Sequence, residues 1–157
     1  MFKLLLAALA ATLALAAPAF AGQCPGPSAA VAAEILAAVN AERAREGRAP
    51  LARDSRLDAA AQGHACDMAT KGFFDHRGSS GSSVGNRVRA AGLRSCTTAE
   101  NIAYGWRETG RVMAEWMQSS GHRANILRGS VNAIGIGYVP ASGGAGPWWV
   151  QVFANPC

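Results

Sequence analysis

Apolar residues recur every three or four positions in two stretches after residue 27, which is the period of one face of a helix. The first stretch has Ser28 as a candidate N-cap and ends at Gly47. The second starts at Asp54 or Ser55 and ends at Gly72. The spacing predicts two long helices. Their apolar positions are Val31, Ile35, Leu36 and Val39 in the first, and Leu57, Ala61, His64, Ala65 and Met68 in the second.

The middle of the chain contains shorter segments separated by glycine. Residues 78–85 are rich in Gly and Ser, which predicts an exposed loop. Thr109 is a candidate N-cap, and Gly121 is a candidate break in the helix that follows it. We expect a short helix at 84–91, a short strand at 102–106, a helix at 109–121 and one or two further helical turns at 122–128.

The C-terminal part has the composition of strands. Ala133–Val139 and 148–154 are rich in β-forming residues, and the turn-forming sequence PASGGAGP separates them, which predicts a hairpin. Gly135 and Gly137 are unusual inside a strand and indicate close approach by another group. Helices followed by strands, without strict alternation, favour an α+β domain with helices on both sides of an antiparallel sheet.

The first 21 residues have the pattern of a secretory signal peptide. Lys3 supplies a positive charge, an apolar run of Leu and Ala follows, and 19–21 form a small-x-small cleavage site. The run is short for a membrane-spanning helix, which needs about 20 apolar residues. We therefore expect a secreted or periplasmic protein whose mature chain, 22–157, forms one domain.

The formal net charge is +5, with 15 basic and 10 acidic residues. The arginines are scattered from Arg43 to Arg128 and form no stripe of the kind that follows a nucleic-acid backbone. The composition therefore argues against nucleic-acid binding. We expect a monomer that does not span a membrane.

Four cysteines remain after removal of the signal peptide. An even number in an exported chain indicates two disulfides, for which three connectivities exist. No CxxC spacing is present, which argues against a metal cluster. Our working pairing is Cys66–Cys96 and Cys24–Cys157, since the second bond would tie together the two ends of the mature chain.

Three histidines and one glutamate stand in distinctive segments. These are HACDMA with His64, FFDH with His76, AENIAYGW with Glu100 and WMQSSGHRANIL with His122. In this order, and followed by GIGY, the segments resemble the CAP superfamily. That superfamily includes cysteine-rich secretory proteins, insect venom allergens, plant pathogenesis-related proteins and the SCP-like domains exported by bacteria. The resemblance covers essentially the whole mature chain and is strongest to the bacterial branch.

The resemblance implies a three-layer α-β-α sandwich with a central antiparallel sheet and a cleft lined by two histidines and two acids. On this chain the histidines are His76 and His122, and the first acid is Glu100. The second acid of the eukaryotic pattern falls at Ser119, so the set of four is incomplete. Glu115 lies one helical turn from Ser119 and is the candidate substitute.

Two imidazoles and a carboxylate brought together by folding could bind Zn²⁺, with His76 and His122 as ligands. They could also act as general acid and base. His76 and His122 lie far apart in the sequence and match no local zinc motif, so only the resemblance places them together. The alternative is a satisfied polar network that locks helices to the sheet without a ligand.

Several other polar and aromatic residues have simpler interpretations. We expect His64, on the apolar face of its helix, to be buried and bonded to the backbone. Asn125 is expected to bond nearby backbone, and Arg123 to be solvated or paired with a carboxylate. Adjacent residues of a strand point to opposite faces. We therefore expect Trp116 in the core, and one of Trp148 and Trp149 to be buried while the other forms a contact surface.

These observations favour a binding module over an enzyme. The export signal, the expected disulfides and the lack of an evident nucleophile fit a secreted module that binds a lipid, a sterol or an extracellular protein partner. The alternative is a divalent-metal-dependent extracellular hydrolase, with His76 and His122 holding the ion and Glu100 as base. A third hypothesis is a structural or signalling role in the cell envelope. The residues do not identify the ligand.

Overall fold

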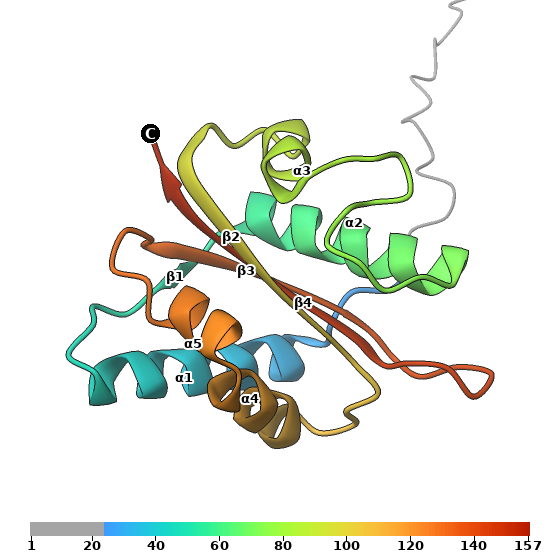
Figure 1. Ribbon diagram of the computed structural model, residues 1–157, viewed down its shortest axis with the longest axis horizontal. Coiled ribbons are helices and arrows are strands. Elements are labelled where there is room, and N and C mark those ends of the chain that lie inside the picture. The colour runs from blue at the N-terminus through green and yellow to red at the C-terminus, as the bar shows by residue number, and fades with distance from the viewer. Residues whose placement is uncertain (1–23) are drawn as a thin grey trace, which may run out of the picture.

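Within residues 24–157, the part of the chain that this computed structural model describes, four strands form one sheet in the order β1-β3-β4-β2. Helices cover both faces of that sheet (Figure 1). The expected signal peptide, 1–21, lies outside the described residues. In chain order the elements are α1 (Ala29–Arg45), β1 (Ala52–Arg53), α2 (Ser55–Lys71), α3 (Val84–Ala90), β2 (Ser95–Tyr104), α4 (Thr109–Gln118), α5 (Ser120–Ile126), β3 (Ala133–Val139) and β4 (Trp148–Pro156).

The two long helices form where the apolar spacing predicts them. Ser28 caps α1, because its Oγ accepts a hydrogen bond from the Val31 backbone N–H at 3.2 Å. Asp54 caps α2 by accepting from the Arg56 backbone N–H at 2.8 Å. Gly72 ends α2 with a φ of 68°, a left-handed conformation that glycine adopts readily. No helix of the described residues has the length and apolar character needed to cross a membrane.

Two helix boundaries differ from the prediction. Thr109 is the first residue of α4 rather than its N-cap, which is Glu108. The Thr109 hydroxyl instead donates to the Glu34 carboxylate and so joins α4 to α1. The chain leaves helical geometry at Ser119, whose ψ is 121°, and Gly121 lies inside α5. The break between α4 and α5 therefore lies at Ser119 and not at Gly121, where the sequence predicted it.

The hairpin of β3 and β4 is confirmed, and β4 also pairs antiparallel with β2. The two-residue strand β1 pairs parallel with β3, so the sheet is mixed rather than wholly antiparallel. A strand of that length carries no periodicity and was not predicted. Strand β2 begins at Ser95, well before the expected start at residue 102, because polar residues such as Thr97 and Glu100 conceal its alternation.

The helix α2 packs directly on β3, as the two strand glycines indicated. A Cβ atom on Gly135 would overlap the backbone of Leu57, and one on Gly137 would overlap that of Ala61. Glycine is therefore required at both positions for this approach. The sheet and α2 carry Glu100 and His64, two of the titratable residues described below.

Alternate side chains of β2 and β4 divide between two apolar cores. Trp149 and Phe153 face α1, α4 and α5, where Trp116 is also buried as expected. Trp148 and Val152 face α2 and α3. The expectation that one of the neighbouring tryptophans faces outward is wrong, since their exposed fractions are 6% for Trp148 and 2% for Trp149. Because helices cover both faces of the sheet, side chains that point to opposite faces are both buried in a core.

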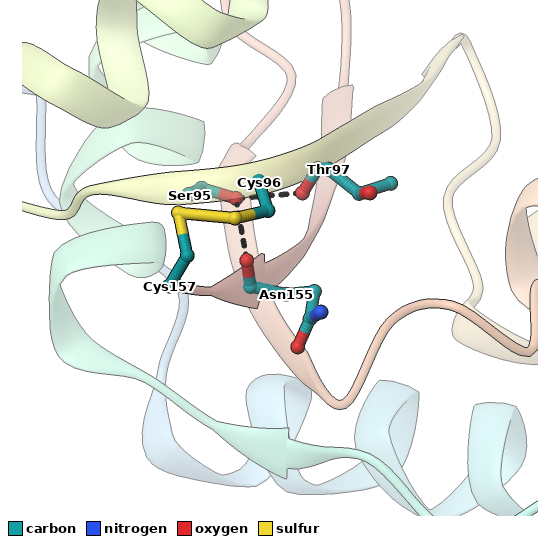
Figure 2. Close-up of a disulfide and its surroundings, with 5 residues drawn as sticks. All are labelled: Ser95, Cys96, Thr97, Asn155 and Cys157. Atoms are coloured by element: carbon teal, nitrogen blue, oxygen red, sulfur yellow. Dashed lines mark hydrogen bonds between the residues drawn. A yellow bond between two sulfur atoms is a disulfide. The ribbon is translucent and has the colours of Figure 1, made fainter.

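A disulfide between Cys96 and Cys157 joins the beginning of β2 to the chain end just after β4 (Figure 2). The Cα atoms of the two cysteines lie 5.4 Å apart, within the usual range for this bond. The neighbouring Ser95 hydroxyl donates to the carbonyl oxygens of Thr97 and Asn155, at 2.6 Å and 3.1 Å. These bonds hold the same two chain segments together.

The expected pairing of Cys66 with Cys96 and of Cys24 with Cys157 is therefore wrong. The antiparallel register of β2 and β4 brings Cys96 to Cys157, and strand neighbours cannot be read from cysteine spacing. Cys24 and Cys66 are free thiols in this structure.

Candidate functional site

Glu100 is the centre of a polar cluster on the face of the sheet that α2 and α3 cover. Its side chain is 3% exposed. Oε1 accepts a hydrogen bond from His76 Nδ1 at 2.8 Å, and Oε2 accepts from Arg87 Nη2 at 2.6 Å. A buried carboxylate is costly unless it is paired and hydrogen-bonded, and here both oxygens have a partner. Arg87 was not singled out from the sequence, because the spacing of α3 does not distinguish it from Arg89.

The same cluster fixes segment 73–77, the first part of the connection between α2 and α3. His64 Nε2 donates to the carbonyl oxygen of Asp75 at 2.9 Å. Arg87 Nη2 donates to the carbonyl oxygen of His76 at 3.1 Å. With the His76–Glu100 bond, the segment has three polar anchors on two adjacent residues, Asp75 and His76. Its backbone position is thus set by side chains from α2, α3 and β2.

His64 is fully buried and bonded to backbone, which confirms the expectation for it. The sequence did not predict that His64 lies next to Glu100. In the structure, His64 Nε2 is 3.8 Å from Glu100 Oε1. Burial is the main cause that lowers the pKa of His64, so the ring is neutral at neutral pH. Its Nδ1 is buried and has no hydrogen-bond partner among the described residues.

His122 belongs to α5, which packs on the opposite face of the sheet from α2 and α3, beside edge strand β2. Asn101 Nδ2 donates to its carbonyl oxygen at 3.2 Å. Burial lowers the pKa of His122, and the positive charge of His76 lowers it further. The pKa of His76 is raised, chiefly by its hydrogen bond to Glu100. The charge of His76 therefore affects the pKa of His122, and the two pKa values are shifted in opposite directions.

Ser119 and Glu115 contribute less directly. Ser119 connects α4 to α5, and its side chain makes no capping bond. Glu115 is exposed on α4, and its charge acts to raise the pKa of His122 against the larger effect of burial. Neither residue lines the pocket of about 360 Å³ beside Glu100, whose lining is Asp75, His76, Arg77, Ser83, Val84 and Glu100. Their part in the site remains a prediction.

The donor set of this cleft does not fit a zinc ion. Within residues 24–157, no group of three or more His, Cys, Asp or Glu side chains is arranged to hold a metal. Both Glu100 oxygens are bound, and the positive charge of Arg87 at 2.6 Å would repel a cation. A catalytic zinc takes three protein ligands, and the cleft offers at most the imidazoles of His76 and His122.

Two polar residues of α5 have structural partners. Asn125 Nδ2 donates to the Glu100 backbone oxygen at 3.1 Å, as expected for a side chain that bonds backbone. Arg123 pairs with the Glu46 carboxylate at 2.7 Å, which confirms a carboxylate-paired arginine. These contacts hold α5 against β2 and α1.

An apolar pocket adjoins the anchored segment. Its aromatic rings form a chain, with centroids 6.1 Å apart for Phe74 and Tyr104 and 5.2 Å apart for Tyr104 and Trp148. The exposed fractions of Phe74 and Tyr104 are 51% and 44%, which is high for large apolar side chains. We call this pocket, of about 330 Å³, the aromatic groove; it is lined by Gly72, Phe73, Phe74, Tyr104, Ala145 and Trp148.

The aromatic groove was missed from the sequence. The signal present was the pair of adjacent aromatics Phe73 and Phe74 just after the glycine that ends α2, outside any helix or strand. The apolar spacing of the helices and strands does not explain these two residues, because they belong to none of those elements. The contribution of Tyr104 and Trp148 depends on the pairing of β2 with β4, where the two residues are opposite one another.

Comparisons with known proteins agree with the fold and motifs. Residues 36–153 match the family model described as the cysteine-rich secretory protein family, CAP. The chain is 36% identical over 120 residues to the uncharacterized protein YkwD of Bacillus subtilis (strain 168), covering 76% of this chain and 45% of that protein. It is 29% identical over 104 residues to the uncharacterized membrane protein YlbC of the same organism, covering 66% and 30%.

Two solved structures share the architecture. An extracellular protein containing an SCP domain from Bacillus anthracis str. Ames superposes with a TM-score of 0.73 at 25% identity, over 80% of this chain and 40% of that one. An outer surface protein from Borrelia burgdorferi gives a TM-score of 0.76 at 17% identity, over 85% and 99%. The chain spans less than half the length of the Bacillus relatives. Fold, motif order and family match together show that the chain belongs to the cysteine-rich secretory protein (CAP) family.

Proposed function

We propose that the protein is an exported CAP binding module that takes an apolar ligand of the lipid or sterol class in the aromatic groove. The observation that carries this proposal is the groove itself. No charged side chain lines it, and its volume of about 330 Å³ lies at the lower end of the range of small-molecule pockets, about 300–1,000 Å³. A concave apolar surface of this kind fits a small apolar molecule better than a flat protein surface does.

The Glu100 cluster has a positioning role in this proposal. It fixes segment 73–77 through bonds to Asp75 and His76, and Phe74 precedes these anchors directly. The cluster therefore holds one wall of the groove in place. Loss of the His76 ring alone leaves the two other anchors, so we expect a small effect on binding.

Export is supported by three kinds of observation. The N-terminal residues have the signal-peptide pattern described above. The two structural neighbours carry the descriptions "extracellular protein" and "outer surface protein". A disulfide between Cys96 and Cys157 also fits an oxidising compartment.

The direct test uses two soluble probes, cholesterol sulfate and lysophosphatidylcholine, each below its critical micelle concentration. Isothermal calorimetry should show saturable binding of at least one probe to the wild-type protein. A Phe74→Ala/Tyr104→Ala variant should bind at least about tenfold more weakly, a loss of about 1.4 kcal/mol, because it removes apolar contact area. Trp106→Ala removes an exposed aromatic that does not line the groove and serves as the matched control.

Two results would contradict the proposal. One is the absence of saturable binding of either probe to the wild type. The other is equal affinity of the wild type and the double variant for the probe that binds. An extracellular protein captured by the wild type and lost in the double variant would place a protein partner on the same surface and would replace the lipid or sterol proposal.

A divalent-metal-dependent hydrolase is the second candidate, and one observation favours it. The opposite pKa shifts of His76 and His122 leave one imidazole easier to protonate than the other, as in acid–base pairs. Zn²⁺ titrated into metal-free protein distinguishes the candidates, with His76→Ala/His122→Ala as the comparison. We expect no tight binding, because the cleft lacks a third ligand. Submicromolar binding that disappears in the variant would favour the hydrolase.

A further inference from the structure

Cys24 and Cys66 lie against each other although the structure shows both as free thiols. The Cys66 thiol donates a hydrogen bond to the carbonyl oxygen of Cys24 at 3.7 Å. Gln62, one turn earlier on α2, donates from Nε2 to the carbonyl oxygen of Pro25 at 3.3 Å and holds the start of the described chain on this helix. The approach of the two cysteines is thus supported by neighbouring contacts.

The established disulfide leaves one partner for each remaining cysteine. Four cysteines allow three connectivities. Because Cys96 is bonded to Cys157, pairing of the other two can occur only between Cys24 and Cys66. Two observations therefore indicate the same connectivity, Cys96–Cys157 with Cys24–Cys66. One is the disulfide between β2 and the chain end after β4, and the other is the contact of Cys24 with Cys66 on α2.

The surroundings of Cys66 are those of a structural cysteine rather than a reactive one. Burial is the main cause that raises its pKa to about 11, and the Cys24 thiol adds to this effect. Reactive cysteines have lowered pKa values and lie in electropositive surroundings. Cys24 is only partly buried, so a soluble oxidant reaches its sulfur first.

We propose that Cys24 and Cys66 form a second structural disulfide in the exported protein. The oxidant is a disulfide-bearing molecule of the export compartment. The Cys24 thiolate attacks that disulfide, one thiolate leaves, and a mixed disulfide forms at Cys24. The Cys66 sulfur then displaces the second thiolate, which takes up a proton. One oxidant disulfide is reduced to two thiols while two protein thiols become one disulfide.

The bond would attach the start of the mature chain to α2, just as Cys96–Cys157 attaches its end to β2. It closes a loop that contains the whole of α1. It would also fix Gly26 and Pro27, which together with Cys66 line a pocket of about 560 Å³ along α2. This inference is independent of the ligand proposed for the aromatic groove.

Disulfide mapping tests the proposal, since tryptic cleavage places each cysteine on a separate peptide. The full chain is exported from a bacterial host, purified without reductant, alkylated under denaturing conditions and digested without reduction. Mass spectrometry should show peptides linked through Cys24–Cys66 and through Cys96–Cys157. Alkylated Cys66 in protein that has an intact Cys96–Cys157 bond would overturn the proposal, as would linkage of Cys66 to any other cysteine.

Thermal unfolding gives a second readout. Cys24→Ser and Cys24→Ser/Cys66→Ser should each lower the Tm by roughly 10 °C, because both lose the constraint on the unfolded chain. The two variants should have nearly equal Tm values, since Cys24→Ser alone already breaks the bond. An unchanged Tm in Cys24→Ser would contradict the disulfide, because replacing a half-buried unbonded thiol has little effect.

Discussion

The two faces of the sheet bury polar groups in different ways. On the face that α1, α4 and α5 cover, Asn101 Nδ2 donates to Gln151 Oε1 at 3.1 Å within an apolar core. On the face that α2 and α3 cover, Glu100 is bonded to Arg87 and His76 beside a pocket. Neutral amides complete the first core, whereas charged groups anchor a surface segment on the second. The proposed binding function belongs to the face that α2 and α3 cover, where the charged groups lie beside a pocket.

Two arginines, Arg43 fully buried and Arg87 with an 11% exposed side chain, illustrate the same contrast. Arg43 on α1 donates to the backbone oxygens of Ala49, Ile126 and Arg128, at 2.7 Å, 2.7 Å and 3.0 Å. These bonds join α1 to the end of α5 and the loop beyond it. Arg87 is instead paired with a carboxylate, beside the segment that carries Phe74. One arginine therefore stabilises the fold, while the other positions a surface.

The largest expected effect comes from Arg43→Ala. The variant leaves three backbone oxygens without their donor and removes a buried side chain, so we expect a loss of about 3–5 kcal/mol in the free energy of unfolding. Urea denaturation measures this loss. Arg45→Ala, at an exposed position on the same helix, should change it by less than about 0.5 kcal/mol. Below its melting temperature the Arg43→Ala protein should bind the probe with wild-type affinity, and weakened binding would break the contrast between the faces.

Glu100→Gln should have the next largest effect. The amide keeps the shape of the side chain but leaves the nearly buried Arg87 without its counter-charge. We expect a loss of about 3 kcal/mol in stability. We also expect weaker probe binding, because the substitution weakens the His76–Glu100 anchor and removes the carboxylate that holds Arg87 in position for its bond to the His76 carbonyl oxygen. Denaturation and calorimetry on the same samples measure both. A loss of stability with unchanged probe affinity would contradict the proposal that the Glu100 cluster positions a wall of the aromatic groove.

His76→Ala should have a small effect that depends on pH. The pKa of His76 is raised above 6.5 in the folded state, so its stabilisation is complete below pH 6.5 and is lost as pH rises through the folded-state pKa. The ring is 58% exposed, and solvent screening limits the effect to about 0.5–1 kcal/mol. The difference in unfolding free energy between wild type and variant should therefore be larger near about pH 5.5 than near about pH 9.

His122→Ala is the matched control for that pH dependence, because its sign is reversed. The pKa of His122 is lowered below 6.5, so the wild type loses stability as pH falls from 6.5 through the folded-state pKa. The variant should lose less over the same range. Equal slopes for the His76 and His122 variants would contradict the assigned electrostatic roles.

Local signals were sufficient for the main helices and the hairpin. Ser28, Asp54 and Gly72 mark ends of α1 and α2 because caps act within one turn. Strand β1 was not predictable, because two residues make a strand only when β3 lies beside them. The polar start of β2 was not predicted for a related reason. Thr97 and Glu100 interrupt the apolar alternation, and only contacts made in the folded protein explain why they lie in a strand.

The candidate site was predictable only in part. The family resemblance pointed to Glu100 and His76, which the structure joins directly. It gave no reason to include Arg87 or His64, because their approach to Glu100 depends on how α2 and α3 pack on the sheet. Disulfide pairing likewise depends on strand neighbours. Contacts between distant segments, rather than residue types, were the missing information.

The most direct test of the central claim compares two double variants in the same probe titration. Phe74→Ala/Tyr104→Ala removes two aromatic walls of the aromatic groove, and His76→Ala/His122→Ala removes the two imidazoles of the cleft that the family resemblance implies. The account predicts that the first variant loses at least about tenfold in affinity, while the second stays within about threefold of the wild type. The reverse order, with binding lost in the histidine variant and kept in the aromatic one, would show that the cleft rather than the groove holds the ligand.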